Sequence, residues 1–340
     1  MNSASKISVL LPFRNAQATL EEALESLLAQ SEPHWELVAV DDHSHDASAD
    51  QVTRLARRDA RIRLLTNPGR GLVSALNHGL RACRAPLVAR MDADDHMAPE
   101  RLAAQLAHFQ RRPELALSAS QVHLFPDEQI QAGFREYIRW QNACLTPADI
   151  EREIYVESPF AHPSVTFRRD TVLALGGYRL GPFPEDYDLW LRLFQAGHPM
   201  EKLPQVLLHW RDHPQRLSRT DPRCSRQAFD RLRAHYLARD PRLVAHRHRF
   251  VIWGAGRKTR RRCDPLLALG FRPQAWIDID PRKIGNQVQG APVVPSSWLL
   301  DHDRPFVLIY VTNHGAREEI LEELQGYGYR PGHDCLPVGH

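Results

Sequence analysis

The amino-acid sequence predicts an α/β protein with two domains, each built on a mostly parallel β-sheet that helices cover. The chain has 340 residues, which is too long for one ordinary domain of about 150 residues and suits two. Its first hundred residues alternate between short apolar runs and segments with helical spacing, and a second strand–glycine–helix pattern begins near residue 249. We expect a large domain over residues 1–222, a helical linker over 223–248 and a smaller domain over 249–340.

The first domain should begin with four parallel strands joined by helices. Apolar runs of strand length occupy residues 7–11, 36–40, 62–65 and 87–91. Apolar residues recur at helical spacing over about 20–28, 47–58, 72–80 and 99–111. Thr19 and Glu22 have the spacing of a capping box at the start of the first helix. Apolar strands separated by helices indicate a parallel sheet covered on both faces, which binds ligands outside the carboxyl ends of its strands.

The remaining chain carries a less regular region and then the second α/β pattern. Between residues 115 and 210 we predict short strands over 164–167 and 206–209 and one clear helix near 186–196. An arginine-rich helix is predicted over 223–239. The second pattern runs through strands over 250–253, 274–277 and 306–311, with a helix after the first and after the last.

The composition excludes several classes of protein. Hydrophobic residues make up 43% and charged residues 25% of the chain, which fits a globular protein. A net charge of +3 is too small to indicate nucleic-acid binding by bulk electrostatics. The sequence shows no apolar run near the roughly 18 residues that cross a bilayer and no signal-peptide pattern, and its five cysteines are widely spaced. We therefore expect a cytoplasmic protein without a disulfide framework or structural zinc.

Three acidic motifs follow predicted strands or open a predicted helix. They are Asp41-Asp42, Asp92-Ala-Asp94-Asp95 and Glu185-Asp186-Tyr-Asp188. A turn or a helix cap would explain each of them alone. Residues two apart on an extended segment point the same way, so Asp92 and Asp94 can present both carboxylates to one side. Such a pair suits Mg²⁺ or Mn²⁺ carrying a diphosphate, and the chain has no P-loop signature as another phosphate cradle.

A series of motifs over residues 6–220 resembles a known enzyme family. The motifs are Ser8-Val-Leu-Leu-Pro-Phe-Arg-Asn15, Val40-Asp-Asp-His-Ser-His-Asp46, Gly69-Arg-Gly-Leu-Val-Ser-Ala-Leu-Asn77, Ala89-Arg-Met-Asp-Ala-Asp-Asp95, His162-Pro-Ser-Val-Thr-Phe-Arg168, Gly176-Gly-Tyr178, Glu185-Asp-Tyr-Asp-Leu-Trp-Leu-Arg192 and Trp210-Arg-Asp-His213 with Ser218. In this order and spacing they resemble the family 2 inverting glycosyltransferases, which have the nucleotide-binding GT-A fold. The sequence departs from the usual pattern at His43, where glycine is common, and this change should stiffen the turn.

The resemblance implies a set of residues for the nucleotide of the donor. Pro12 and Arg14 would border the nucleotide. Asp41 or Asp42 would hydrogen-bond the base, for which uracil is expected, and Arg70 would meet the base or the diphosphate.

The resemblance also implies metal, acceptor and catalytic residues. Asp92 would contact the ribose or a water on the metal, and Asp94 would bind Mn²⁺ or Mg²⁺ directly. His213 is a further candidate ligand for the metal or a phosphate, and Glu185, His162 and Arg211 are candidates for acceptor or phosphate contacts. Asp186 would be the general base, because a carboxylate opposite the leaving group can take the proton of the attacking hydroxyl. Glu185 and Asp188 are the alternatives for that role.

These residues predict a metal-dependent inverting glycosyltransferase that moves a sugar from a nucleotide-sugar, expected to be a UDP-sugar, to a hydroxyl of a carbohydrate or lipid-linked acceptor. By analogy with the family, surface polysaccharide or glycolipid biosynthesis is the expected role. A sugar-1-phosphate nucleotidyltransferase is a second interpretation, although its glycine-rich loop after the first strand is replaced here by Pro12-Phe-Arg-Asn15. A third is a non-catalytic nucleotide-sugar sensor.

The C-terminal pattern offers a candidate second nucleotide site. Gly254 and Gly256 follow an apolar strand, and Asp278 lies 22 residues after Gly256, as in a dinucleotide fingerprint, but Thr259 stands where a third glycine is expected. The segment resembles the small Rossmann-like domains appended to bacterial sugar-modifying enzymes, so a structural or regulatory role is the alternative. Basic runs at 246–249 and 257–262 are candidates for peripheral contact with the inner face of a membrane, or else a solvated helix surface.

Overall fold

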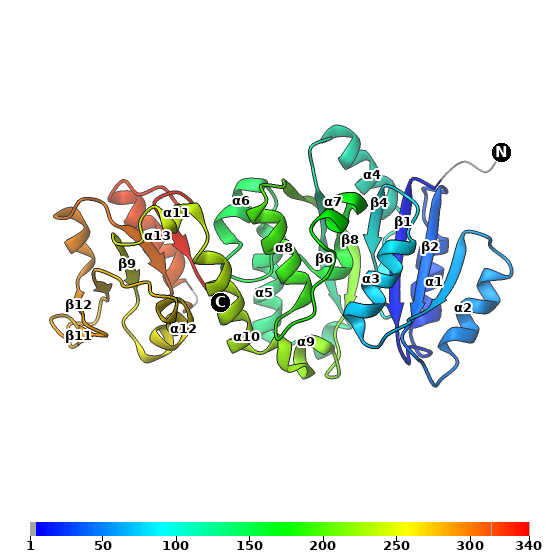
Figure 1. The fold of residues 1–340 in the computed structure, drawn as a ribbon, viewed down its shortest axis with the longest axis horizontal. Helices are drawn as coiled ribbons and strands as arrows, with labels where there is room; N and C mark the ends of the chain where they lie inside the picture. The colour runs from blue at the N-terminus through cyan, green and yellow to red at the C-terminus, as the bar shows by residue number, and fades with distance from the viewer. Residues whose placement is uncertain (1–4, 314, 340) are drawn as a thin grey trace. The chain divides into compact units, whose positions relative to one another are not determined.

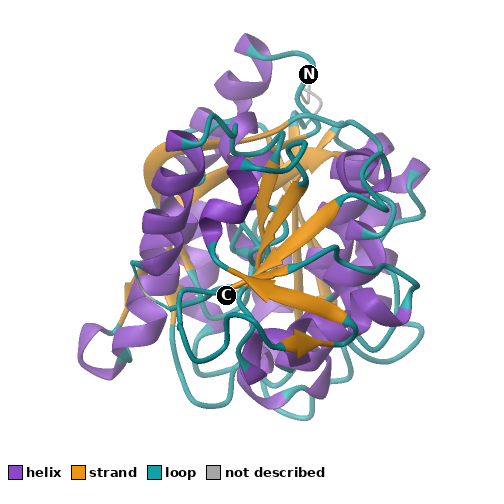
Figure 2. Ribbon diagram, turned by 90° about the vertical axis from the view of Figure 1, so that its left-hand side faces the viewer, coloured by secondary structure: helices purple, strands orange, loops and turns teal. Residues whose placement is uncertain are grey.

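The computed structural model describes residues 5–313 and 315–339 and divides into two compact units (Figure 1). The first unit comprises residues up to 147, 159–181 and 185–220. The second comprises 148–158, 182–184 and the chain from 221 onward. In both units the strands lie between helices (Figure 2), which confirms the predicted α/β class.

An eight-stranded sheet with the order β3-β2-β1-β4-β7-β6-β8-β5 forms the centre of the first unit. Its strands are β1 (Ile7–Phe13), β2 (Trp35–Asp41), β3 (Ile62–Thr66), β4 (Leu87–Arg90), β5 (His96–Met97), β6 (Leu117–Phe125), β7 (Thr166–Arg168) and β8 (Met200–Arg211). The first four strands run parallel, as predicted. Beyond them, β7 pairs antiparallel with β4 and β6, β8 runs parallel to β6, and β5 adds an antiparallel edge.

Helices cover both faces of this sheet, and every side chain of β1 and β2 is therefore buried. The helices are α1 (Leu20–Leu28), α2 (Ser48–Ala56), α3 (Leu72–Ala82), α4 (Arg101–Arg111), α5 (Ala132–Ala143), α7 (Arg169–Ala174), α8 (Glu185–Gln195) and α9 (Leu217–Thr220). Val9 of β1 packs in one core with side chains of α1 and α4. Leu10 points to the opposite face, where a Cβ on Gly79 of α3 would lie 2.3 Å from it. The glycine therefore lets α3 approach the sheet closely.

The capping box predicted at the start of α1 is wrong. The Thr19 side chain makes no capping hydrogen bond, and its hydroxyl instead donates to the carbonyl oxygen of Ala93 at 3.0 Å. The Glu22 carboxylate accepts from His96 at 3.0 Å. Both side chains are thus used to hold the loop after β4, a tertiary demand that the local pattern did not reveal.

The second unit contains a six-stranded sheet with the order β11-β12-β10-β9-β13-β14. Its strands are β9 (Phe250–Trp253), β10 (Trp276–Ile277), β11 (Gln287–Val288), β12 (Ala291–Val294), β13 (Phe306–Ile309) and β14 (Cys335–Pro337). All neighbouring pairs are parallel except the β11–β12 hairpin. The helices are α10 (Arg226–Leu237), α11 (Pro241–Val244), α12 (Arg257–Ala268) and α13 (Ala316–Gly326), and α6 (Pro147–Glu153) lies mostly in this unit.

Two further expectations concern the linker and the membrane. The stretch 223–248, predicted as a helical linker, forms α10 and α11 and belongs to the second unit. Within the described part of the chain, no helix has both the length and the apolar character needed to cross a bilayer.

Candidate active site

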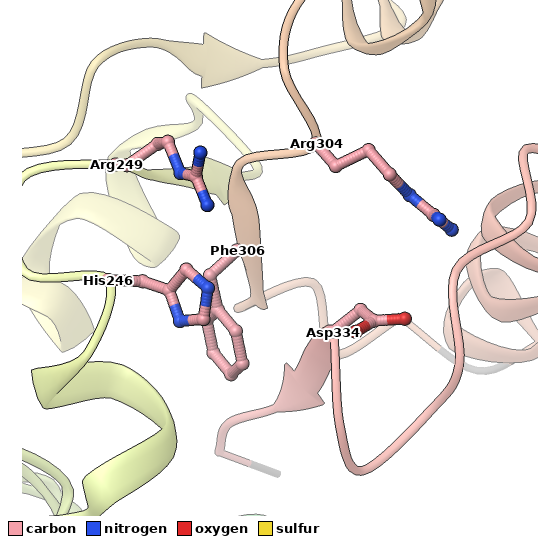
Figure 3. A pocket seen from close by; sticks show the side chains of 5 residues that line it. All are labelled: His246, Arg249, Arg304, Phe306 and Asp334. Atoms are coloured by element: carbon pink, nitrogen blue, oxygen red, sulfur yellow. The ribbon is translucent and has the colours of Figure 1, made fainter.

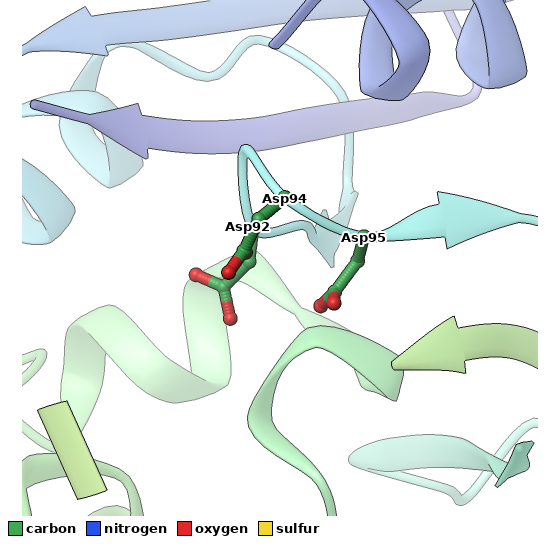
Figure 4. A group of neighbouring side chains, drawn as sticks. All are labelled: Asp92, Asp94 and Asp95. Carbon is green, nitrogen blue, oxygen red and sulfur yellow. The ribbon is translucent and has the colours of Figure 1, made fainter. Parts of the chain in front are cut away.

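An acidic loop, residues 92–95, leaves the carboxyl end of β4 and carries three neighbouring carboxylates. Asp92, Asp94 and Asp95 can each offer an oxygen within 4.8 Å of the others. The three side chains extend to the same side of the loop (Figure 4). Asp92 and Asp94 therefore share a side as predicted, although Ala93 and Asp94 form a turn and not an extended segment, and Asp95 joins them.

The electrostatics of the acidic loop favour a bound cation. Burial and the neighbouring Asp92 raise the pKa of Asp94, and burial with Asp94 and Asp92 raises the pKa of Asp95 well above its ordinary value. Asp95 is fully buried, and its Oδ2 has no hydrogen-bond partner among the described residues. Three carboxylates that repel one another and include a spare buried oxygen form an oxygen-rich donor set that suits a hard divalent cation.

The end of β8 meets the acidic loop through Arg211 and His213. The backbone N–H of Arg211 donates to Oδ1 of Asp95 at 2.8 Å, and its Nε donates to the carbonyl oxygen of Asp94, also at 2.8 Å. His213 Nε2 lies 3.1 Å from Oδ2 of Asp94. The structure thus brings together residues that are more than a hundred positions apart in the sequence.

Arg90, at the end of β4, is a site residue that sequence reasoning missed. Its side chain is 1% exposed and donates to Oδ1 of Asp92 at 2.5 Å. Arg101 of α4, also buried, donates to the carbonyl oxygen of Arg90 at 2.9 Å. An arginine inside an otherwise apolar strand was the available signal, since a charge that cannot reach water needs a partner.

The predicted nucleotide residues lie at the carboxyl ends of β1 and β2. Pro12 is buried and pairs in register with Val40, while Arg14 follows β1 and is exposed. Arg70 precedes α3 and is also exposed. β1 therefore delivers Pro12 and Arg14, and the loop after β3 carries Arg70, to one edge of the sheet.

Asp41 and Asp42 lie at the same edge and organise the loops around it. Asp41 Oδ1 accepts from the backbone N–H of Ser44 at 3.0 Å. Asp42 accepts from the Asn67 amide at 2.6 Å and from the backbone N–H of Gly71 at 2.9 Å. Asp42 thus connects the turn after β2 to the loop that carries Arg70.

His43 has a left-handed backbone conformation, with a φ of 59°. This explains why glycine suits the position in the resembling family. Its Nε2 lies 2.7 Å from the carbonyl oxygen of Gly69. The ring therefore forms a second connection between the turn after β2 and the loop that carries Arg70.

Asp186 lies in the first turn of α8, where the positive end of the helix dipole favours a carboxylate. It is half-buried, and its Oδ1 accepts from the backbone N–H of Tyr187 at 2.7 Å. Asp188, an alternative base, points into the unit and forms a buried ion pair with Arg192 at 2.8 Å. The same guanidinium donates to the carbonyl oxygen of Gly177 at 2.8 Å. Asp188 therefore has a structural task.

Tyr178 is buried and is influenced by charges at the start of α8 and by Arg90. Its hydroxyl lies 2.9 Å from Nε2 of His162, which begins a short 3₁₀ helix. Burial raises the pKa of Tyr178, the carboxylates of Asp186 and Glu185 raise it further, and Arg90 opposes them. Arg90 in turn holds Asp92. Charges from the start of α8 and from Arg90 therefore act on one buried tyrosine.

In the second unit, the glycine loop after β9, which contains Gly254 and Gly256, is in contact with side chains of the same unit. Gly254 has a φ of 112°, and a Cβ there would lie 3.0 Å from the Thr259 side chain. Asp278 accepts from the backbone N–H of Ala255 at 2.9 Å and from Lys283 at 3.0 Å. Gly256 begins α12 as its N-cap residue. Both oxygens of Asp278 are engaged within the unit, the second by the backbone N–H of Asp280.

A small cavity of about 160 Å³ lies in the second unit, lined by His246, Arg249, Arg304, Phe306 and Asp334 (Figure 3). These residues lie where β9, β13 and β14 begin, at the opposite edge of the sheet from the glycine loop. The His246 ring stacks on Phe306, and Asp334 is paired with Arg330 at 3.1 Å. The cavity is thus separate from the candidate second nucleotide site.

Comparisons with known proteins agree with this geometry. Residues 8–173 match a family profile described as "Glycosyl transferase family 2". The amylovoran biosynthesis glycosyltransferase AmsE of Erwinia amylovora is 36% identical over 204 residues, which cover 59% of this chain and 74% of that protein.

Two solved structures share the fold. TarS 1–349 of S. aureus in complex with UDP-GlcNAc aligns over 78% of this chain and 80% of that chain, with a TM-score of 0.53 and 16% identity. The mannosyltransferase PcManGT from Pyrobaculum calidifontis, in complex with GDP-Man and Mn²⁺, aligns over 79% of this chain and 69% of that chain, with a TM-score of 0.50 and 21% identity. At these identities the likeness concerns the fold alone.

Proposed function

The chain belongs to glycosyltransferase family 2, and from this premise we propose that it transfers a sugar, with inversion, from a UDP-sugar to a hydroxyl acceptor. Membership selects the glycosyltransferase among the three functions that the sequence left open. The observation that carries the finer proposal is the acidic loop at the carboxyl end of β4, where Asp92, Asp94 and Asp95 can each offer an oxygen within 4.8 Å of the others.

For the donor, the carboxyl edge of β1 and β2 supports binding of the nucleotide. The exposed guanidinium groups of Arg14 and Arg70 lie there, and such groups bind phosphate or base edges. Pro12 and the Asp41-Asp42 pair would border and orient the base. Two complexes of fold relatives, with UDP-GlcNAc and with GDP-Man, support a nucleotide-sugar.

For the cation, the residues of the acidic loop would hold Mn²⁺ or Mg²⁺. Asp94 is the central ligand in this proposal, with Asp92 and Asp95 beside it and His213 at hydrogen-bond distance. A cation bound there supplies positive charge for the diphosphate as it leaves. Arg90 orients Asp92, and Arg211 fixes the loop through Asp95.

For the chemical step, Asp186 would act as the general base. The acceptor oxygen forms a bond to the anomeric carbon, and the bond from that carbon to the phosphate oxygen breaks. The hydroxyl proton passes to Asp186, and the electron pair of the broken bond leaves with the nucleoside diphosphate. One displacement from the opposite face inverts the anomeric configuration. Glu185 and His162 border this region and would contact the acceptor or a phosphate.

The proposed acceptor is a carbohydrate or lipid-linked sugar in surface polysaccharide or glycolipid biosynthesis. The name of AmsE, a glycosyltransferase of amylovoran biosynthesis, supports this role. Peripheral contact with the inner face of a membrane through the basic runs at 246–249 and 257–262 would bring the enzyme to a lipid-linked acceptor.

A donor screen tests the proposal. The chain is incubated with UDP-, GDP-, CDP- and dTDP-sugars and simple glycoside acceptors, with Mn²⁺ or with EDTA, and released nucleoside diphosphate is measured. We expect release from a UDP-sugar that EDTA abolishes and that Asp94→Asn reduces by about 10² or more. Asp127→Asn, which changes an exposed carboxylate of the same unit, is the matched control and should release at the wild-type rate. Release that is indifferent to both EDTA and Asp94→Asn would refute the metal-dependent proposal.

A further inference from the structure

The small cavity of the second unit has a basic lining. Two of its five side chains are arginines, Arg249 and Arg304, and a third is His246. The one acid among them, Asp334, is engaged by a residue outside the lining. Its Oδ2 accepts from the backbone N–H and Nε of Arg330 at 3.0 and 3.1 Å, and its Oδ1 accepts from Nη2 of the same residue at 3.3 Å. The cavity therefore keeps an excess of positive charge.

The two arginines lie on different sides of the cavity (Figure 3). Arg249, just before β9, lies on the side of the His246 ring, and Arg304, just before β13, lies on the side of Asp334. The stack of His246 on the buried Phe306 ring forms one wall. A ligand in this space would lie between two guanidinium groups.

Both arginines keep donors beyond the contacts that they already make. Arg249 forms an ion pair with Asp303, but these side chains are 48% and 90% exposed, and such exposed pairs hold their partners weakly. Arg304 donates through Nη2 to the carbonyl oxygen of Gly328. A guanidinium carries five N–H donors, so each arginine can bind an anion and keep its present contact.

The backbone holds Arg304 at the cavity in an unfavourable conformation. Its φ is 38°, in the left-handed region that is costly for a residue with a Cβ. Its N–H donates to the carbonyl oxygen of His302 at 2.6 Å, in a tight turn before β13. Backbone conformations of this kind are often found where a side chain is held for a ligand.

The size and charge of the cavity select a small oxyanion. Its volume of about 160 Å³ is below the roughly 300 Å³ of the smallest sites for drug-sized ligands. Arginine forks bind carboxylates and phosphates. A carboxylate presents two oxygens in one plane, which a single fork satisfies, whereas the tetrahedral oxygens of a phosphate can accept from two sides at once. A phosphate group therefore fits the placement of the two arginines.

We propose that this cavity is a phosphate-binding site, in which Arg249 and Arg304 donate to oxygens of one phosphate group. That group belongs either to a soluble phosphorylated molecule or to the head group of an anionic phospholipid, since Arg249 ends the basic run 246–249. The site is independent of the proposed sugar transfer, because none of its residues takes part in that reaction.

Titration with inorganic phosphate tests the site. The full chain and the variants Arg249→Gln, Arg304→Gln and Arg247→Gln are titrated calorimetrically at constant ionic strength in EDTA, so that no divalent cation at the acidic loop can bind the anion. Arg247 is the matched control. It is exposed in the same basic run, donates to the carbonyl oxygen of Leu269 at 3.3 Å and lies 4.5 Å from the centre of the Phe271 ring, but it does not line the cavity. Thermal unfolding verifies that each variant folds.

Arg249→Gln and Arg304→Gln should each raise the Kd for phosphate about tenfold, since a charge-assisted hydrogen bond is lost. Arg247→Gln should stay within about twofold of the wild type. Unchanged affinity in both cavity variants would overturn the proposal. So would a loss of affinity confined to Arg70→Gln, because the anion would then bind at the proposed donor site of the first unit.

A vesicle assay distinguishes the two sources of the phosphate. The same proteins are sedimented with vesicles of phosphatidylcholine, alone or with about 30 mol% phosphatidylglycerol. Co-sedimentation that needs phosphatidylglycerol, is reduced in Arg304→Gln and persists in Arg247→Gln would support a lipid head group. Phosphate binding without co-sedimentation would support a soluble phosphorylated molecule. Equal losses in Arg304→Gln and Arg247→Gln, or a wild type that binds neither phosphate nor vesicles, would overturn the proposal, whatever the donor screen shows.

Discussion

At the scale of single residues, His43 combines an unfavourable backbone conformation with a useful side-chain contact. A φ of 59° is costly for a residue with a Cβ and free for glycine. The contact of its ring with the carbonyl oxygen of Gly69 at 2.7 Å offsets this cost. The departure from the family pattern is thus compensated within the loop that carries Arg70.

Replacement of His43 separates the two effects. His43→Ala keeps the Cβ and loses the ring, so it should lower the free energy of unfolding by about 1 kcal/mol. His43→Gly loses the ring but also relieves the backbone, so it should be more stable than His43→Ala by roughly 1 kcal/mol. Urea unfolding of the three proteins checks this order, and an alanine variant as stable as the glycine variant would contradict it.

The Asp94 carboxylate should destabilise the folded protein when no metal is bound and stabilise it when Mn²⁺ is bound. Because burial and Asp92 raise its pKa, the ionised carboxylate is disfavoured in the folded protein at neutral pH. Asp94→Asn should therefore raise the free energy of unfolding in EDTA, by on the order of 1 kcal/mol. Mn²⁺ should raise the Tm of the wild type by several degrees and leave that of Asp94→Asn nearly unchanged. A Tm of Asp94→Asn that rises with Mn²⁺ as much as that of the wild type would refute the assignment.

The relative placement of residues within one motif was predictable, whereas the contacts that other residues make with the motif were not. The spacing of the motif predicted that Asp92 and Asp94 share a side, although a turn at Ala93 and Asp94, and not strand alternation, produces this in the structure. Arg90 looked like one member of an apolar strand, and its bond to Asp92 depends on a turn at the strand end. The ion pairs that the buried Asp212 forms with Arg216 and Arg219 depend on how the turn after β8 folds back. Neither relation follows from spacing.

At the scale of secondary-structure elements, strongly periodic segments were predicted well and the middle of the chain was not. The first four strands and α13 agree with their apolar patterns to within a few residues. In contrast, β6 and α5 were missed. β6 alternates serine with apolar residues and carries Gln121 and His123, and it lies between β7, which runs antiparallel to it, and β8, which runs parallel to it. Polar residues there are held by tertiary hydrogen bonds, such as that from the Gln121 amide to the carbonyl oxygen of Asn142 at 3.1 Å.

In β8, Lys202 provides a pH-dependent contribution to stability. It is 3% exposed and donates to the carbonyl oxygens of Gln141 and Pro159. Burial lowers the pKa of Lys202 to about 8, from an ordinary value of 10.5. Between these two values the unfolded chain binds more protons than the folded one, so stability rises with pH across that window and is constant below it.

Comparison with Lys202→Met isolates this effect. The free energy of unfolding of the wild type relative to Lys202→Met should rise by about 2 kcal/mol between pH 7.5 and pH 9.5. The other titrating groups cancel in the difference. Urea unfolding at the two pH values provides the measurement, and a difference that stays constant or falls would show that the lysine keeps its ordinary pKa.

At the scale of the whole molecule, the two-sheet organisation was predictable, but the assignment of short segments was not. A separate series of strand and helix patterns in the sequence predicted each sheet. Residues 148–158 and 182–184 belong to the second unit although the chain on both sides of them belongs to the first. Membership of a unit depends on packing over long sequence distances, which local patterns do not contain.

The fold also explains how distant motifs form one site. Parallel strands deliver the residues after β1, β2 and β4 to a single edge of the sheet. The segment after β8 then returns His213 to Asp94, and α8 carries Asp186 in its first turn. The proposed transfer needs the acidic loop for the leaving diphosphate and Asp186 for the incoming hydroxyl.

Replacement of Asp186 by asparagine tests most directly whether this residue serves the chemical step and not donor binding. Donor binding and sugar transfer are measured for the same Asp186→Asn protein, by titration with the nucleoside diphosphate and by release of that diphosphate in the presence of acceptor. Our account predicts a Kd within about twofold of the wild type and a loss in kcat of about 10² to 10⁴, as expected when a general base is removed. Transfer at the wild-type rate, or loss of donor binding together with transfer, would contradict the account.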